Sequence, residues 1–189
     1  MRIILLASGN GSLAQAIIDA KKSGELNLEI VGLISDKQSP AIERAESAGI
    51  STTFLPMQEN RSSWDDEIFQ VVSKINPDLV VSVGFMRILA PAFISNFPTI
   101  NTHPALLPNF PGAHAVRDAL DSGVEVTGST VHWVDEGIDT GTVIRQKEVD
   151  VLPTDDESSL HERIKIVERE LIVETLKGFI ANGLPRRNQ

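Results

Sequence analysis

The chain has 189 residues, of which 41% are hydrophobic, and this size and composition indicate one globular domain. It has no cysteine, which excludes disulfides, cysteine nucleophiles and thiolate metal sites. The formal net charge of −9 argues against nucleic acid as the main partner, because proteins that bind nucleic acid usually carry a basic face. There is no apolar run long enough for a membrane span or a signal peptide, so we expect a cytoplasmic protein without a membrane partner.

Short aliphatic runs alternate with segments of helical periodicity in the first half of the chain. The predicted strands are Arg2–Ala7, Leu28–Ser35, Thr52–Leu55 and Leu79–Val83. The predicted helices are Leu13–Lys22, Ala41–Ala48 and Trp64–Ile75. Gly24 and Gly49 lie where helices end, and Pro77 prevents the third helix from continuing. This alternation predicts a doubly wound, Rossmann-like α/β fold with a mostly parallel sheet and helices on both faces.

The second half of the chain is richer in proline. We expect Pro91–Pro111 to be an ordered loop around one short strand, Thr99–Thr102. Glu125–Val134 and Thr142–Val149 predict an antiparallel addition to the sheet. The sequence from Thr154 to Glu157 matches a capping box, which predicts a helix that continues to about Ile180. We therefore expect a single domain over 1–189, with an N-terminal half of about 1–100 and a C-terminal half of about 101–181.

The loop Ser8–Ser12 follows the first predicted strand and precedes the first predicted helix. Its glycines permit a sharp turn, and the helix N-terminus directs unpaired N–H groups toward a ligand. This pattern, with Ser12 as the helix N-cap, predicts a phosphate site, and the alternative is a tight turn without a ligand. The series Gly9-x-Gly11-x-x-Ala14, with Asp36 ending the second strand, also fits a dinucleotide site. An NAD-dependent oxidoreductase is therefore an alternative.

Asn101 and His103 lie two residues apart at a strand end, so their side chains leave the same face. Asp139 lies further on in a loop that contains glycines. An amide can stabilise an oxyanion, an imidazole can carry a proton, and a carboxylate can orient the imidazole. These residues predict acyl transfer to a nucleophile supplied by the substrate, because no serine or cysteine nucleophile motif is evident. The alternative is a turn-capping Asn101 and a structural His103; His132 is expected to be structural.

Two strings of the second half, Asn101–Pro108 and Gly128–Gly141, closely resemble those of the folate-dependent formyltransferases. Within this family, Ser8–Ser12 and Gly84–Leu89 are similar to members that act on glycinamide ribonucleotide. The resemblance extends from Met1 to about Ile180. It implies transfer of a formyl group from 10-formyltetrahydrofolate to the primary amine of glycinamide ribonucleotide in de novo purine biosynthesis, without a metal.

The resemblance also implies the catalytic roles. Asn101 and a protonated His103 would stabilise the oxyanion, and Asp139 would pair with His103 and help to relay a proton through water. A formyltetrahydrofolate deformylase shares these three residue types and is an alternative, although such enzymes usually carry an N-terminal regulatory domain. A methionyl-tRNA formyltransferase would need an additional C-terminal domain and a basic face.

Binding residues are implied by the same resemblance. Gly11 and Ser12 match the backbone cradle for the ribonucleotide phosphate, and Leu13 replaces an asparagine that is frequent in the family. The folate-binding residues are Arg61, Phe85, Met86, Arg87, Ile88 and Leu89. The main chain of the last five would line the pterin pocket, and the two arginines would lie near the anionic ends of the substrates. The alternative for Phe85–Leu89 is a buried strand end on which Arg87 extends to solvent. The alternative for Arg61 is a solvated surface residue.

Glu168 falls within the apolar stripe of the last predicted helix, where an inward carboxylate needs a partner. The stripe consists of Leu160, Ile164, Val167, Leu171, Leu176 and Phe179. The resemblance implies that Glu168 accepts hydrogen bonds from the ribose hydroxyls, and the alternative is an internal salt bridge to a lysine or arginine. The sequence leaves the oligomeric state open, with a homodimer among the alternatives.

Overall fold

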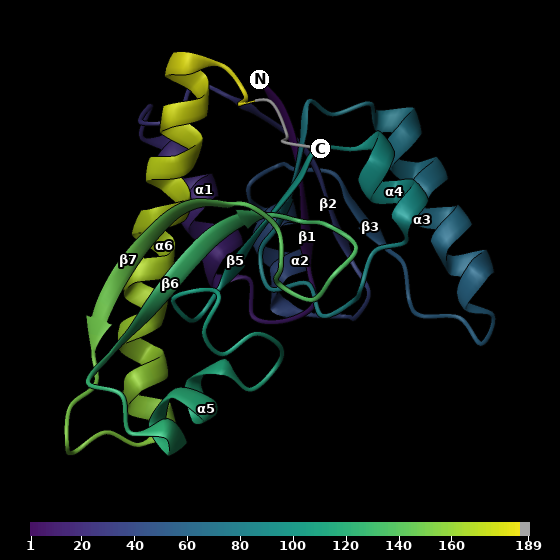
Figure 1. Cartoon of the computed structure of the whole chain (residues 1–189). Coiled ribbons are helices and arrows are strands. Elements are labelled where there is room, and N and C mark those ends of the chain that lie inside the picture. Colours follow the sequence, from purple (N-terminus) through teal and green to yellow (C-terminus); the bar gives the residue numbers. More distant parts are fainter. Residues whose placement is uncertain (186–189) are drawn as a thin grey trace. The chain divides into compact units, whose positions relative to one another are not determined.

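The computed structural model of the chain describes residues 1–185. It contains two compact units, Met1–Ile100 and a second unit that begins at Asn101. Figure 1 shows the helices and strands coloured in chain order. No helix of residues 1–185 is long and apolar enough to cross a membrane.

The first unit contains a parallel sheet with the strand order β3-β2-β1-β4. Its strands are β1 (Arg2–Ala7), β2 (Glu29–Ser35), β3 (Thr52–Phe54) and β4 (Leu79–Ser82). Its helices are α1 (Ser12–Lys22), α2 (Pro40–Ser47), α3 (Arg61–Ile75) and α4 (Pro91–Asn96). The predicted elements of this half are thus confirmed to within a few residues at each end, which is the usual uncertainty of element boundaries.

The central strand β1 is buried on both sides. Every residue from Ile3 to Ala7 is 0% exposed, and successive side chains of a strand point to opposite faces, so both faces of the sheet are covered. Helices α1 and α2 pack against each other, while α3 and α4 meet through aromatic rings. The Phe97 ring centroid lies 5.2 Å from that of Phe69 and 4.9 Å from that of Phe93.

Helix α4 corrects the prediction that Pro91–Pro111 is loop around one strand. Pro91 occupies the first turn of this helix, where the missing N–H of proline costs nothing and its fixed φ favours the helical turn. The short strand in this segment is confirmed as β5 (Thr99–His103), which begins in the first unit and ends in the second.

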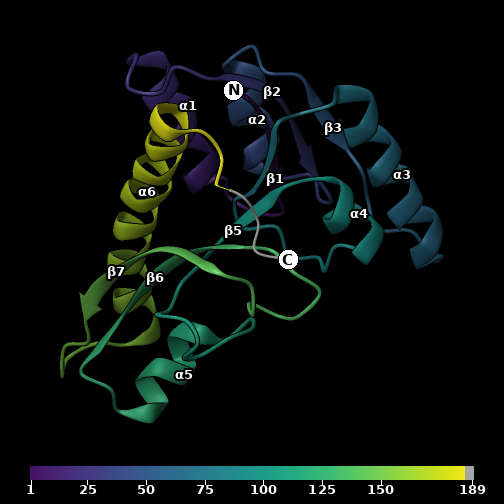
Figure 2. The ribbon, with the colours of Figure 1, turned by 45° about the horizontal axis from the view of Figure 1, so that its top comes forward.

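The second unit contains the strands in the order β5-β6-β7, and β6 and β7 are antiparallel. Its other elements are α5 (Ala115–Ser122), β6 (Val126–Trp133), β7 (Val143–Asp150) and α6 (Glu157–Asn182). Helix α6 packs against β6, β7 and α5 (Figures 1 and 2). The predicted Rossmann-like, mostly parallel sheet with an antiparallel C-terminal addition is confirmed, whereas α5 was not predicted.

Helix α6 begins with a capping box that lies two residues after the predicted one. Oδ1 of Asp156 accepts a hydrogen bond from the Ser159 N–H at 2.7 Å, and the Ser159 hydroxyl accepts one from the Asp156 N–H at 3.0 Å. The prediction of a box from Thr154 to Glu157 is therefore wrong. The neighbouring Asp155 carboxylate accepts from the Leu152 N–H at 2.8 Å and forms an ion pair with Arg163, so Asp156 is the residue left to cap.

Candidate active site

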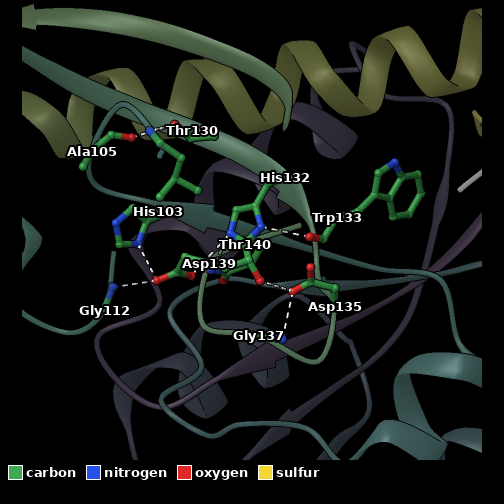
Figure 3. A network of polar contacts seen from close by, with 12 residues as sticks. His103, Ala105, Gly112, Thr130, His132, Trp133, Asp135, Gly137, Asp139 and Thr140 are labelled. Atoms are coloured by element: carbon green, nitrogen blue, oxygen red, sulfur yellow. Dashed lines mark hydrogen bonds and ion pairs between the residues drawn. The ribbon is translucent and has the colours of Figure 1, made fainter. Parts of the chain in front are cut away.

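Polar side chains of β6 fix the loop that follows β5. The Ser129 hydroxyl donates to the His103 carbonyl oxygen at 3.2 Å. The Thr130 hydroxyl donates to the Ala105 carbonyl oxygen at 2.6 Å and accepts from the Leu107 N–H at 3.1 Å (Figure 3). These bonds hold the backbone from His103 to Leu107, so the predicted Asn-x-His motif is followed by a fixed segment.

The loop between β6 and β7 is shaped by Asp135 and two glycines. Oδ1 of Asp135 accepts from the Gly137 N–H at 3.1 Å and from the Thr140 hydroxyl at 2.8 Å. A Cβ at Gly137 would lie 1.9 Å from Thr140 Oγ1, and one at Gly141 would lie 1.7 Å from the Trp133 carbonyl oxygen. Neither position can therefore accept a side chain without a shift of the loop.

This loop places Asp139 beside two histidines. Oδ2 of Asp139 lies 3.3 Å from His103 Nδ1 and accepts from the Gly112 N–H at 2.8 Å. Oδ1 of the same carboxylate lies 3.5 Å from His132 Nε2 (Figure 3). Asp139 has a φ of +55°, a left-handed conformation that is uncommon outside glycine and that concentrates at functional sites.

The three predicted catalytic residues are brought together in the second unit, and a fourth residue joins them. Asn101 Nδ2 lies 3.3 Å from His132 Nε2, while His132 Nδ1 lies 2.9 Å from the Trp133 carbonyl oxygen. His132 was expected to be only structural, yet it contacts both Asn101 and Asp139. The pairing of β6 with β7 shifts register between Val131 and His132. Such an irregularity redirects side chains and cannot be deduced from the alternation of residue types.

Burial and hydrogen bonding act in opposite directions on His103. Its side chain is 4% exposed, and Nε2 lies 2.8 Å from the Phe110 carbonyl oxygen. Burial lowers the pKa of His103 below its ordinary value of 6.5 and outweighs the raising effects of Asp139 and of the Phe110 carbonyl. At pH 7 the ring is therefore neutral, and it can donate to only one of the two acceptors that face it.

Asp139 stays ionised in this surrounding. Burial raises the pKa of its carboxyl group, but the contacts to His132, to the Gly112 N–H and to His103 outweigh it and lower that pKa from 3.8 to about 2. At pH 7 the Asp139 carboxylate therefore lies beside a neutral His103 ring. That ring carries one N–H but faces two acceptors, Asp139 Oδ2 and the Phe110 carbonyl oxygen. Within residues 1–185, no cluster of three or more His, Asp or Glu side chains could hold a metal ion.

In the first unit, the predicted phosphate loop is braced by α2. Gly11, rather than the predicted Ser12, is the N-cap of α1, with φ +77°, and a Cβ there would lie 2.7 Å from Ala41 Cα. Arg44 donates to the Asn10 carbonyl oxygen at 2.9 Å and to Asn10 Oδ1 at 3.1 Å. Ser12 is the first helical residue, so its N–H is one of the unpaired donors at the helix start.

The side chain of Leu13 is not part of this loop surface, because it is buried in the core at 8% exposure. Only the main chain of Leu13 remains to contribute to a ligand site.

The predicted folate segment has alternating burial. Phe85 and Leu89 are buried, whereas Met86 and Ile88 are 66% and 60% exposed. The Met86 N–H donates to the Ser8 hydroxyl at 2.9 Å, which joins this segment to the phosphate loop. The Ile88 carbonyl oxygen accepts a hydrogen bond from Arg61.

The two predicted cationic residues already have acidic partners. Arg61 Nε lies 2.8 Å from Asp65 Oδ1, and its guanidinium lies 5.3 Å from the Trp64 ring centroid. Arg87 Nε lies 2.6 Å from Oδ2 of Asp36, whose side chain is 0% exposed. The acid that the dinucleotide alternative requires is therefore engaged by an arginine of the same unit.

Glu168 is buried, as its place in the apolar stripe predicted. It is 6% exposed on α6, and burial raises its pKa from 4.5 to about 7, against the lowering effects of Lys165 and Arg169. No ion pair joins it to a lysine or arginine of residues 1–185. The salt-bridge alternative is thus not found in the described part of the chain, and Glu168 is a buried carboxyl group that lacks a cationic partner.

Comparisons with known proteins agree on one family. The profile described as Formyl transferase matches residues 1–176. A phosphoribosylglycinamide formyltransferase from Mycobacterium tuberculosis is 47% identical over 187 residues, covering 97% of this chain and 86% of the relative. The enzyme of the same name from Escherichia coli is 40% identical over 176 residues, covering 90% of this chain and 83% of the relative.

Solved structures give the same result. A glycinamide ribonucleotide transformylase from Symbiobacterium toebii has a TM-score of 0.94 at 34% identity, covering 100% of this chain and 91% of the other. A phosphoribosylglycinamide formyltransferase from Bacillus halodurans has a TM-score of 0.92 at 34% identity and full coverage of both chains, 100% and 100%. The chain belongs to the formyl transferase family.

Proposed function

We propose that this protein transfers a formyl group from 10-formyltetrahydrofolate to the primary amine of glycinamide ribonucleotide, a step of purine biosynthesis. The observation that carries the proposal is the contact of Asp139 with His103 within one partly buried cluster that also includes Asn101. The names of the relatives and solved structures support the choice of acceptor. Their family supports a folate-derived formyl donor.

The chemistry begins when the neutral amine attacks the formyl carbon. A new N–C bond forms, and the electron pair of the carbonyl moves to oxygen, which gives a tetrahedral oxyanion and a positively charged nitrogen. The Asn101 amide donates a hydrogen bond to the oxyanion, where a positioned donor contributes most. The intermediate collapses when the bond to the folate nitrogen breaks and that nitrogen takes up a proton.

The His103–Asp139 pair carries the proton between the two nitrogens. The neutral His103 ring faces two acceptors, Asp139 Oδ2 and the Phe110 carbonyl oxygen. A proton released by the amine, carried by water, lets the ring donate to both, and the pair then returns it to the leaving folate nitrogen. His103 is therefore proposed to gain its proton during the reaction, which modifies the expectation of a ring that is already protonated.

The ribonucleotide is proposed to bind through its phosphate and its ribose. The N–H groups of Gly11, Ser12 and Leu13 at the start of α1 would hold the phosphate, because a helix N-terminus favours an anion even on a chain with net charge −9. Glu168 would accept hydrogen bonds from the ribose hydroxyls, which would give this buried carboxyl group the partners it lacks.

The folate is proposed to bind along Phe85–Leu89 through main-chain atoms. The Met86 N–H and the Ile88 carbonyl already have partners in the protein, so the main chain of Arg87 and Leu89 is proposed to read the pterin edge. The placing of the Arg61 and Arg87 charges near anionic substrate ends stays a prediction, as do the single domain and the cytoplasmic location. The oligomeric state stays open, with a homodimer among the alternatives.

A steady-state assay tests the proposed function. Purified protein is mixed with glycinamide ribonucleotide and a 10-formyl folate, and release of the deformylated folate is followed by absorbance. The proposal predicts release that requires the ribonucleotide. Release at the same rate without the ribonucleotide would instead identify a deformylase, and no release in either mixture would refute the proposed reaction.

A further inference from the structure

His132 is a buried polar residue that the proposed mechanism does not use. Its side chain is 3% exposed and lies on β6, between the main chain of its own strand and the catalytic cluster. Both ring nitrogens have contacts: Nδ1 with the Trp133 carbonyl oxygen at 2.9 Å, and Nε2 with Asn101 Nδ2 at 3.3 Å and Asp139 Oδ1 at 3.5 Å. The arrangement determines what each nitrogen of the neutral ring does.

The Trp133 carbonyl oxygen can only accept a hydrogen bond, so the neutral His132 ring carries its proton on Nδ1. Nε2 then has a lone pair and is an acceptor. Of its two neighbours, the Asp139 carboxylate has no proton to donate at neutral pH, whereas the Asn101 amide does. The hydrogen bond therefore runs from Asn101 Nδ2–H to His132 Nε2.

This bond selects one of the two orientations of the Asn101 carboxamide. If the amide turned over, its oxygen would face the Nε2 lone pair, and two acceptors would oppose each other. With the nitrogen facing His132, one N–H is used by His132 and the second remains available. A carboxamide that is free to turn would present its oxygen to the reacting carbonyl part of the time, which would repel the developing oxyanion.

We infer that His132 is a positioning residue that fixes the Asn101 carboxamide so that its second N–H donates to the oxyanion of formyl transfer. The inference rests on the proposed function for the oxyanion, and the direction of the hydrogen bond rests on the contacts together with a neutral His132 ring, since a doubly protonated ring would donate from Nε2 to Asp139. His132 acts through Asn101 and need not touch a substrate. The competing role is a structural one, in which only the bond from Nδ1 to the Trp133 carbonyl matters.

Two substitutions separate these roles because each preserves one ring nitrogen. In His132→Asn, the side-chain amide can replace Nδ1–H and donate to the Trp133 carbonyl oxygen, but nothing replaces Nε2. In His132→Gln, the longer side chain brings an oxygen to the place of Nε2, where it can accept from Asn101, and the bond to Trp133 is lost. The two roles therefore predict opposite rankings of the variants.

The inference predicts that His132→Asn lowers kcat by about tenfold to a hundredfold, which does not exceed the effect of removing an oxyanion donor altogether. Both KM values should be nearly unchanged. It predicts that His132→Gln retains most of kcat. Melting temperatures of both variants are measured alongside. A His132→Asn enzyme with normal kcat, or a His132→Gln enzyme that is the more impaired of the two, would overturn the inference.

A double-mutant cycle with Asn101→Ala shows whether His132 acts through Asn101. We expect His132→Asn to lower kcat in the wild-type background and to have little further effect when Asn101 is already alanine. Equal effects in the two backgrounds would mean that His132 works independently of Asn101, and would contradict the positioning role.

The tautomer is measured without any substrate by ¹⁵N-resolved NMR of the histidine side chains, with His132→Gln used for assignment. The inference requires the proton on Nδ1 of the neutral ring. A proton on Nε2, directed at Asp139, would refute it even if the enzyme is active. Conversely, a wild-type enzyme with the expected tautomer but without formyl transfer would refute the proposed function and leave the geometry of the Asn101–His132 bond confirmed.

Discussion

Asp36, which follows β2 directly, forms an ion pair with Arg87 in the segment between β4 and α4, with 2.6 Å between Oδ2 and Nε. The Asp36 side chain is fully buried, and its other oxygen, Oδ1, has no hydrogen-bond partner in the described structure. The arginine is therefore the main compensation for this buried charge. The same contact occupies the acid that a dinucleotide site would use for a ribose, so the Gly9-x-Gly11 pattern alone does not indicate NAD.

This pair leads to a stability prediction. Arg87→Ala should lower the free energy of unfolding by roughly 2–4 kcal/mol, because it leaves a buried carboxylate without a counter-charge. Adding Asp36→Asn to Arg87→Ala should restore much of that loss, since a neutral amide is cheaper to bury. Denaturant unfolding of the single and double variants measures both effects. Additive losses in the double variant would show that the two residues are not coupled.

Asp139→Asn tests the carboxylate of the catalytic cluster. We expect kcat to fall by about a thousandfold or more, as for other carboxylates that orient a catalytic histidine, with KM for both substrates little changed. The amide cannot carry the negative charge that His103 needs when it gains a proton. Steady-state kinetics with both substrates varied give the two constants. A near-normal kcat would remove Asp139 from the mechanism.

Most of the fold could be predicted because its signals are long and periodic. β1 is a continuous aliphatic run and α1 and α3 have regular apolar spacing, so their positions follow from hydrophobic patterning. Helix α4 was missed because it has only 6 residues, too few for a periodic pattern to stand out. Length alone does not explain why α5 was missed, because the predicted α2 has 8 residues as well. The predicted start of α6 was two residues too early because Thr154, Asp155 and Asp156 are all acceptable N-caps by residue type.

The candidate site was predictable in part for a different reason. Asn101, His103 and Asp139 lie in short motifs whose residue types indicate their chemistry. His132 could not be found in this way, because its contacts depend on the register irregularity of β6. The partner of Arg87 was likewise invisible, since Asp36 becomes its neighbour only through the fold. The i,i+4 pair of Arg61 with Asp65 was missed because the predicted helix began at Trp64 and left Arg61 outside it.

Glu168 predicts a pH dependence of stability. Its folded pKa of about 7 lies above its ordinary value of 4.5, so the native state binds more protons than the unfolded chain between these two values. The free energy of unfolding therefore falls as pH rises through this window, by roughly 3 kcal/mol in total from this group. Glu168→Gln should remove that slope and be more stable than wild type at pH 8. Parallel pH profiles for the two proteins would contradict the assignment.

The same variant tests the proposed contact of Glu168 with ribose. A glutamine keeps the shape of the side chain but is a weaker acceptor than a carboxylate. We expect KM for the ribonucleotide to rise while KM for the folate changes little. Equal changes in both KM values would indicate a general effect on the site rather than a contact with the ribose.

Leu13→Asn introduces the asparagine that the family resemblance gives for this position. Because Leu13 is only 8% exposed, we expect the asparagine to lower the free energy of unfolding by roughly 2–4 kcal/mol, through lost apolar burial and a buried amide. KM for the ribonucleotide should stay nearly unchanged if main-chain N–H groups hold the phosphate. A tighter KM without loss of stability would show that the side chain can leave the core and reach the ligand.

Transfer of the formyl carbon itself tests the central claim most directly. The donor is prepared with ¹³C in its formyl group, and the products formed with glycinamide ribonucleotide are examined by NMR. Our account predicts that the label appears as a formamide on the amine of the ribonucleotide, and that Asp139→Asn forms this product far more slowly. Label that appears as free formate, with the ribonucleotide unchanged, would contradict it.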